Sequence, residues 1–275
     1  MSFRVSTNVA SLTAQRHLTI AQRDTEKSLQ ALASGSRVTR PGNDAAGFAI
    51  AEGLRGQLSG IKQAQMNADG AIGLLQVAEG GLNEQNNILI RLRELAVYSA
   101  SDTLGDDERG FINTEFQQLS AEYNRIAETT RYGNKKLLTG TGEEFQFHVG
   151  AYSGAENMIK FKLDADTTGS ESGIDGLTIE DQDSALDSLT ELDGALAKVA
   201  EARSTFGAMQ SRLQHASDHL LSQKENIAAA RSQIADTDVA EESSNLARAS
   251  IVQEAAVAVL AQANMNTNRM LKLIG

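Results

Sequence analysis

Two heptad patterns of apolar residues constrain the fold of this chain most strongly. The first lies toward the C-terminal end, and its members are Leu192, Val199, Phe206, Leu213, Leu220, Ile227 and Ile234. The second lies toward the N-terminal end, and its members are Leu54, Ile61, Ala68, Leu75, Leu82, Leu89 and Ala96. Each pattern predicts a helix of about 60 Å that buries one stripe, since an α-helix rises 1.5 Å per residue. Because both patterns have seven members, we expect the two helices to pack against each other, and we call their large residues the bundle seam.

Composition supports long helices and excludes several classes of protein. The 275 residues include one proline, no cysteine and 4% aromatic residues, so helices are rarely interrupted and neither disulfides nor thiolate metal sites can form. The chain has no long apolar run and its first 20 residues lack an apolar core, so we expect neither membrane insertion nor a Sec signal peptide. The net charge of −11 argues against nucleic acid as a partner.

Each heptad pattern is separated from its chain terminus by a break. The segment Ser34–Asp44 holds two glycines and the only proline, and Asp236-Thr237-Asp238 interrupts the C-terminal pattern. Asp238 with Glu241 resembles a capping box, which predicts a new helix beyond the break. A weaker helix therefore lies at each terminus, and we expect these two helices to pair.

The terminal helices carry too few large apolar residues to fold alone. Their terminal assembly seam consists of Val5, Val9, Leu12, Leu246, Leu260 and Ile274. Burying a leucine contributes about 1.5–3 kcal/mol, whereas ordering each residue costs about 1–2 kcal/mol. We therefore predict that residues 1–35 and 240–275 are largely disordered in the monomer and fold by packing against other copies.

The middle of the chain changes from helix to strand. A shorter helix with Ile112, Phe116 and Tyr123 on one face can fold back on the second heptad helix. Alternating apolar residues at 145–149 and 159–163 then predict a β-hairpin, and 177–179 predict a further short strand. The fold class is mainly α, a long antiparallel helical bundle or coiled coil with a small β-hairpin region and paired termini. We expect a terminal coiled-coil domain at 1–43 and 236–275, a helical bundle at 44–140 and 184–235, and its hairpin region at 141–183.

Candidate chemical sites are few. His215 and His219 have the spacing of a helical metal pair, but no third ligand is evident and surface histidines are the better interpretation. We predict no catalytic residues, metal or cofactor, and no enzyme activity. Arg91 and Leu95 on one helix and Glu115 on the next lie off the heptad stripes, which indicates either a protein-contact patch or an ordinary helix surface.

Motifs at both ends of the chain resemble those of bacterial flagellins. The N-terminal motifs are Asn8–Arg16, Leu32–Val38 and Asp44–Gly47, and the C-terminal motifs are Ala230–Asp238 and Leu260–Asn264. The similarity covers residues 1–140 and 185–275. Only residues 141–184 separate the two halves, so the variable outer domains of many flagellins are absent.

The resemblance implies a fold arrangement and a set of partners. The terminal helices would form the inner core of a filament and the bundle its outer core. Export would use the flagellar type III apparatus and a flagellin-specific chaperone, giving an extracellular filament that meets cap and junction proteins. In several flagellins the patch that matches Arg91, Leu95 and Glu115 packs subunits together and, in monomers, is bound by Toll-like receptor 5.

We therefore predict a structural protein that self-assembles helically into a hollow flagellar filament for motility. A hook–filament junction protein and a signalling coiled-coil module are the alternatives. The motifs Leu32–Val38 and Leu260–Asn264 favour flagellin over a junction protein. A signalling coiled coil would form a dimer with folded ends and no fibres.

Overall fold

The computed structural model describes residues 7–274, without the side chains of residues 267, 268 and 270–274. The chain forms two compact units, one from residues up to 57 together with those from 226 onward, and the other from residues 58–225. The division lies inside two long helices, whereas the predicted domain limits at 43 and 236 lie at helix breaks.

The described part of the chain is mostly helical, as predicted. The helices are α1 (Val9–Ser34), α2 (Ala45–Ser99), α3 (Asp106–Thr129), α4 (Gly169–Ser172), α5 (Gln182–Ala235) and α6 (Val239–Ile274), with a 3-10 turn η1 (Ala155–Asn157). The strands are β1 (Arg131–Tyr132), β2 (Lys135–Lys136), β3 (Glu144–His148) and β4 (Met158–Lys162). They form two separate antiparallel pairs, β1–β2 and β3–β4.

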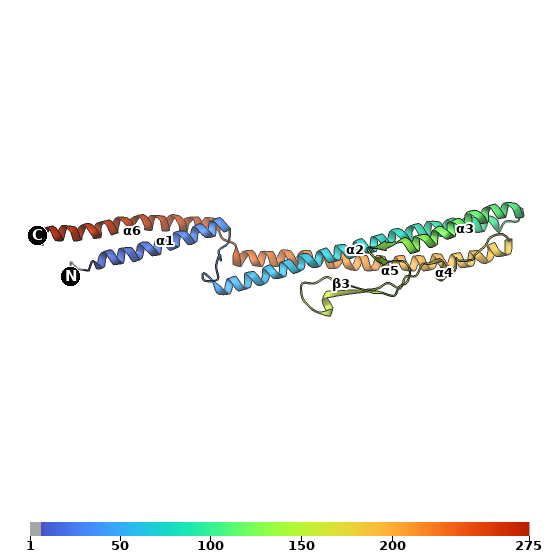
Figure 1. Ribbon diagram of the computed structural model, residues 1–275, viewed down its shortest axis with the longest axis horizontal. Coiled ribbons are helices and arrows are strands. Elements are labelled where there is room, and N and C mark those ends of the chain that lie inside the picture. The colour runs from blue at the N-terminus through green and yellow to red at the C-terminus, as the bar shows by residue number, and fades with distance from the viewer. Residues whose placement is uncertain (1–6, 275) are drawn as a thin grey trace. The chain divides into compact units, whose positions relative to one another are not determined.

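In the first unit, the two predicted breaks lie side by side. Helix α1 ends at Gly35, whose φ of 68° is the left-handed conformation that glycine adopts readily. The Arg37 amide donates to the Ala235 carbonyl at 2.7 Å, and the Thr237 amide donates to the Gly35 carbonyl at 3.0 Å. The Asp238 carboxylate then accepts bonds from the first amides of α6, so the predicted cap is confirmed. These contacts start α1 and α6 as the antiparallel pair seen in Figure 1.

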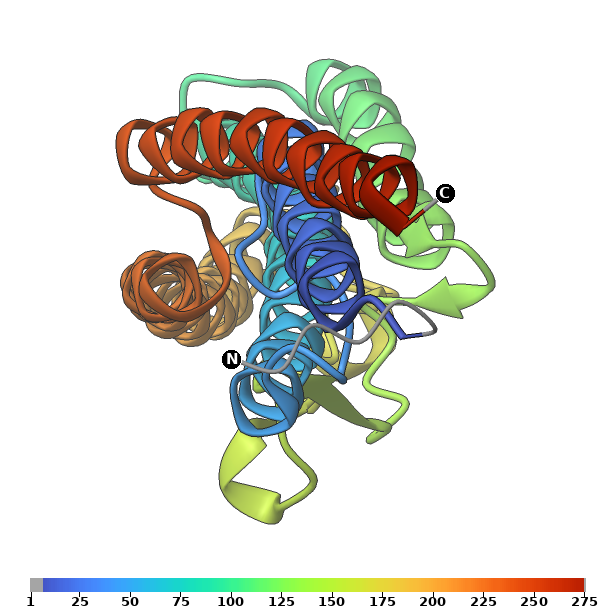
Figure 2. The ribbon, with the colours of Figure 1, turned by 90° about the vertical axis from the view of Figure 1, so that its left-hand side faces the viewer.

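In the second unit, α2 and α5 bury their heptad residues, and those from Leu75 to Leu89 and from Leu192 to Leu213 share one core. The fully or nearly fully buried members are Ile61, Leu75, Leu82, Leu89, Leu192, Val199, Phe206, Leu213 and Leu220. Helix α3 adds Phe116 and Tyr123 to this core. In both views α3 and the β3–β4 hairpin lie on different sides of the α2–α5 pair (Figures 1 and 2).

The predicted hairpin is confirmed, with Phe145 opposite Phe161 in the β3–β4 register. Phe145, Ile159 and Phe161 are buried in the core of the bundle. The Phe161 ring meets the Phe206 ring of α5 edge-on, with centroids 5.6 Å apart. The hairpin is therefore a layer of the bundle that covers α5.

A glycine allows the turn after α3 to approach α2 closely. A Cβ placed on Gly81 would lie 2.6 Å from the Thr130 Oγ1 atom and 2.9 Å from the Leu138 Cδ1 atom. The neighbouring Gly80 has no such atom within 4 Å. Gly81 is thus required by packing, whereas Gly80 is not.

The strand predicted at 177–179 is wrong. The segment has no strand partner, and side chains of the helices bond its backbone instead. Gln117 donates to the Leu177 carbonyl at 2.7 Å, Ser188 donates to the Thr178 carbonyl at 3.1 Å, and Asn113 accepts from the Ile179 amide at 3.3 Å. Because buried backbone groups need partners, these polar side chains replace a neighbouring strand.

Candidate subunit-contact surfaces

The helices of the terminal pair touch through small residues. Helix α1 buries Ser11, Ala14, Ala21, Ser28 and Ala31, and α6 buries Ala256 and Ala263. Small side chains at heptad spacing let two helices approach closely but contribute little apolar area.

Polar contacts set the register of this pair. The Ser11 hydroxyl donates to the Asn264 side chain at 3.0 Å, and the Asn8 amide donates to the Ala263 carbonyl at 3.1 Å. The Thr25 hydroxyl donates to the Gln253 side chain at 3.4 Å, so this polar residue of α6 has a partner on α1. Part-buried hydrogen bonds contribute only about 0.5–1.5 kcal/mol each to stability. These bonds therefore select the register of the helix pair more than they stabilise the pair.

The α1 members of the terminal assembly seam lie outside the α1–α6 contact, whereas its α6 members are partly covered. Val9 and Leu12 are 64% and 57% exposed, whereas Leu246 and Leu260 are half-buried. Val5 and the Ile274 side chain lie outside the described residues. The face of α1 that packs against α6 is made of alanine and serine. These small side chains let the two helices approach more closely than leucine and valine would.

The outer faces of the pair carry many more large apolar side chains. The other exposed ones in α1 and α6 are Ile20, Leu29, Val239, Ile251, Val252, Val257, Val259 and Met265. Large apolar side chains exposed in such number along two paired helices indicate protein–protein contacts. Sequence periodicity assigned one stripe to each terminal helix and missed this two-sided arrangement.

In the second unit, the predicted patch at Arg91, Leu95 and Glu115 is only partly assembled. Arg91 donates to the Glu115 carboxylate at 2.8 Å and to Glu94 at 3.1 Å, and these three side chains are exposed. The bonds to Glu115 and Glu94 raise the pKa of the Arg91 guanidinium. The pair links α2 to α3 at the surface.

Leu95 does not belong to the exposed patch, so that part of the prediction is wrong. It is 5% exposed and lies in the core of the bundle. Leu74, Gly81, Ile88 and Leu95 form a second heptad row on α2, and this row is covered because α2 packs against more than one element. A search for one stripe per helix could not detect the second row.

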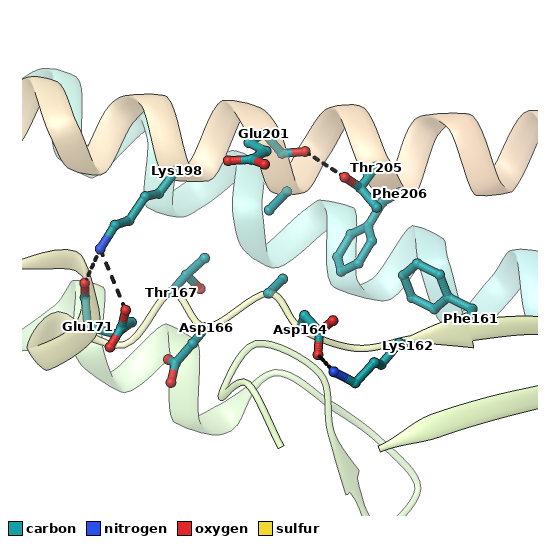
Figure 3. A pocket seen from close by; sticks show the side chains of 12 residues that line it. Phe161, Lys162, Asp164, Asp166, Thr167, Glu171, Lys198, Glu201, Thr205 and Phe206 are labelled. Atoms are coloured by element: carbon teal, nitrogen blue, oxygen red, sulfur yellow. Dashed lines mark hydrogen bonds and ion pairs between the residues drawn. The ribbon is translucent and has the colours of Figure 1, made fainter. Parts of the chain in front are cut away.

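A groove separates the strand β4 and the loop after it from α5, as Figure 3 shows. Phe161 and Phe206 form its apolar floor, and its volume is about 400 Å³. At its rim Lys162 pairs with the Asp164 carboxylate at 2.8 Å, and Lys198 pairs with the Glu171 carboxylate at 3.8 Å. We call it the hairpin groove. Its lining is spread over residues 161–206, which no short sequence motif reveals.

Chemical sites are sparse in the part of the chain that the structure describes. His215 and His219 are exposed, and no group of three possible metal-ligating side chains occurs among the described residues. No described helix is long and apolar enough to cross a membrane. Burial raises the pKa of Tyr123 to about 12, partly offset by its hydrogen bond with Ser172, and this side chain lies in the core of the bundle.

Comparisons with known proteins match both ends of the chain. The family described as bacterial flagellin N-terminal helical region matches residues 5–143, and the bacterial flagellin C-terminal helical region matches residues 189–274. A flagellin of Halalkalibacterium halodurans is 38% identical over 271 residues, which is 98% of this chain and 99% of the relative. A flagellar filament core protein of Brachyspira hyodysenteriae is 36% identical over 98% of this chain and 99% of its own length.

A solved structure agrees with these sequence matches. The crystal structure of Bacillus cereus flagellin is 30% identical to this chain, with a TM-score of 0.51. The match covers 60% of this chain and 94% of that structure.

Proposed function

Because the chain belongs to the bacterial flagellin family and is a structural subunit of the flagellar filament, we propose that its terminal helix pair drives assembly. The observation that carries this proposal is the exposed apolar surface on both α1 and α6. With 275 residues the chain is a short form of flagellin, and its match to the Halalkalibacterium halodurans flagellin covers nearly the whole length of both proteins. Other copies of the same chain cover the exposed faces in the filament.

Folding of the terminal pair is coupled to assembly. Alanine and serine form most of the buried stripe of α1, and burying such small side chains offsets little of the backbone entropy of two long helices. Neighbouring copies supply the missing apolar area when they cover Val9, Leu12 and the valines of α6. Contacts between different faces of successive copies do not close into a ring, so they extend as a helical fibre. The terminal segments 1–43 and 236–275 thus act as the inner core, and the bundle with its hairpin at 44–235 acts as the outer core.

The exposed Arg91–Glu115 pair is a second contact surface in this proposal. Its position on α2 and α3, away from the bundle core, supports contact with a neighbouring copy. In the monomer the same surface would be open to Toll-like receptor 5, as the family resemblance implies. Leu95 is left out of this surface because it is buried.

The remaining partners follow from family membership. The chain would leave the cell through the flagellar export apparatus without a Sec signal peptide, escorted by a chaperone on its C-terminal segment. In the extracellular filament it would meet cap and junction proteins. The protein would have no catalytic activity.

The two alternatives are not favoured. Relatives that match almost the whole chain include a flagellin and a flagellar filament core protein. Electron microscopy of the purified chain after salting out or seeding tests the choice. We expect long hollow filaments, and a population of soluble dimers would contradict the proposal.

Amide hydrogen exchange tests the coupling of folding to assembly. We expect weak protection of Val9–Ser34 and Val239–Asn266 in the dilute monomer and strong protection in the filament, with the core helices of residues 58–225 protected in both. Strong protection of the terminal segments in the dilute monomer would show that the pair folds alone.

A further inference from the structure

The turn between β1 and β2 presents a compact basic surface that the bundle itself does not use. Gly133 and Asn134 connect the two strands, and Gly133 has a φ of 60° as such tight turns require. Arg131, Tyr132, Lys135 and Lys136 are all exposed, with Tyr132 46% exposed. In a chain of net charge −11, three cations beside an exposed aromatic ring form an uncommon surface.

The arrangement of these cations is unfavourable in an isolated copy. Arg131 lies directly opposite Lys136 in the β1–β2 register, and like charges at opposed positions destabilise a strand pair. Lys135 is neutralised inside the copy by Glu143 at 2.8 Å and lies over the Phe145 ring. Arg131 and Lys136 have no ion pair within the described residues. Two unpaired cations therefore face solvent on a turn that is anchored through Lys135.

The hairpin groove has the complementary charge and chemistry. Its ionisable lining residues are Lys162, Lys198, Asp164, Asp166, Glu171 and Glu201, for a net charge of −2. Both lysines are engaged by acidic neighbours in the groove. The carboxylate of Glu201 makes no ion pair in the described chain and lies at the open rim in Figure 3. The apolar lining of the groove consists of Ala165 and Ala202 together with the edges of Phe161 and Phe206, whose rings are almost fully buried.

We propose that the β1–β2 turn of one copy docks in the hairpin groove of a second copy in the filament. The Tyr132 ring would lie against the apolar lining of the groove, while Arg131 and Lys136 would pair with the exposed carboxylate of Glu201. The occupant is a second copy because charge complementarity joins two surfaces of the same chain, and because the chain builds a homopolymer. This proposal rests on the proposed function. Turn and groove are different surfaces, so each copy can donate a turn and accept another, as a growing fibre requires.

Disulfide trapping tests the contact directly, since the natural chain has no cysteine. The double variant Tyr132→Cys with Thr205→Cys places one thiol on the turn and one at the groove. We expect disulfide-linked ladders after mild oxidation of filaments, and no disulfide in dilute monomer. Each single variant is the control and should give no ladder. Filaments that form normally but give no ladder would overturn the proposal, as would a disulfide within the monomer.

Charge reversal provides the energetic test. Lys136→Glu or Glu201→Lys alone should raise the concentration needed for polymerisation by about three- to tenfold at low salt, because a rim pair becomes a repulsion. The double variant should restore polymerisation, and the single-variant effects should shrink at high salt. Lys62→Glu is the matched control, since it makes the same charge change on an exposed part of α2 and should have no comparable effect.

The outcomes distinguish failure of the docking proposal from failure of the proposed function. If wild-type chain forms filaments but both reversed variants polymerise like it, the docking proposal fails and the proposed function stands. If wild-type chain forms no filaments, the proposed function fails and this proposal with it. Circular dichroism of each variant monomer checks that a lost contact, rather than misfolding, causes any defect.

Discussion

Substitution of two adjacent glycines by alanine should have opposite effects on stability. In an ordinary exposed helix position Gly→Ala stabilises by about 0.5–1 kcal/mol, because alanine loses less backbone entropy on folding. Gly80 is exposed with no atom within 4 Å of the added Cβ, so Gly80→Ala should gain this amount. Gly81 differs because its Cβ would meet Thr130 and Leu138 at 2.6 and 2.9 Å.

The cost at Gly81 follows from what must move. The Thr130 hydroxyl donates to the Ile126 carbonyl at 2.7 Å, and Leu138 is fully buried. Overpacking costs about 1–3 kcal/mol and loss of the hydrogen bond about 0.5–1.5 kcal/mol. After subtracting the helix gain, Gly81→Ala should be less stable than wild type by about 0.5–4 kcal/mol.

Denaturant unfolding followed by tyrosine fluorescence measures this difference. The four tyrosines, at positions 98, 123, 132 and 152, all lie in the unit of residues 58–225, so the signal reports this unit alone. Gly80→Ala is the matched control for helix propensity. If Gly81→Ala were as stable as Gly80→Ala, the close approach of the turn after α3 to α2 would be wrong.

Three further predictions concern the same unit. Gln85→Leu should lower the free energy of unfolding by about 2–4 kcal/mol, because the buried Gln85 amide bonds both the backbone carbonyl and the hydroxyl of Thr167. In a double-mutant unfolding cycle, Gln85→Leu with Thr167→Val should lose less stability than the sum of the two single changes. Because burial raises the pKa of Tyr123 to about 12, the unfolded state releases this proton first, so the free energy of unfolding should fall between about pH 10 and 12. Unfolding curves of Tyr123→Phe should lack this part of the pH dependence, and an unchanged slope would contradict the prediction. Exchanging Arg91 and Glu115 should leave monomer unfolding nearly unchanged but weaken assembly measured by sedimentation, and equal assembly would remove this pair from the contact surfaces.

Periodicity identifies the helices well where one stripe is buried against one partner. The α2 and α5 helices and the β3–β4 hairpin follow directly from heptad spacing and alternation, and the breaks follow from glycine, proline and aspartate. Leu95 could not be placed in the same way, because its burial depends on a second heptad row and on a third packed element. The segment 177–179 also lay beyond sequence reasoning, since its strand-like residues are bonded by side chains that are distant in the sequence.

The terminal helices show a further limit of sequence reasoning. Large residues such as Val9 and Leu12 suggest where a helix buries its surface, but here the intramolecular contact uses Ala14, Ala21 and Ser28. Small residues permit close packing of two helices but do not produce a recognisable hydrophobic periodicity in the sequence. Polar pairs such as Ser11 with Asn264 fix the register and are visible only in three dimensions.

Deletion of residues 240–275 tests most directly whether the terminal pair drives polymerisation. The truncated chain should keep the tyrosine-reported unfolding transition of wild type, because the unit of residues 58–225 holds its own core. Electron microscopy of the same sample, salted out or seeded beside the full chain, should show no filaments. Normal hollow filaments from the truncated chain would contradict the account.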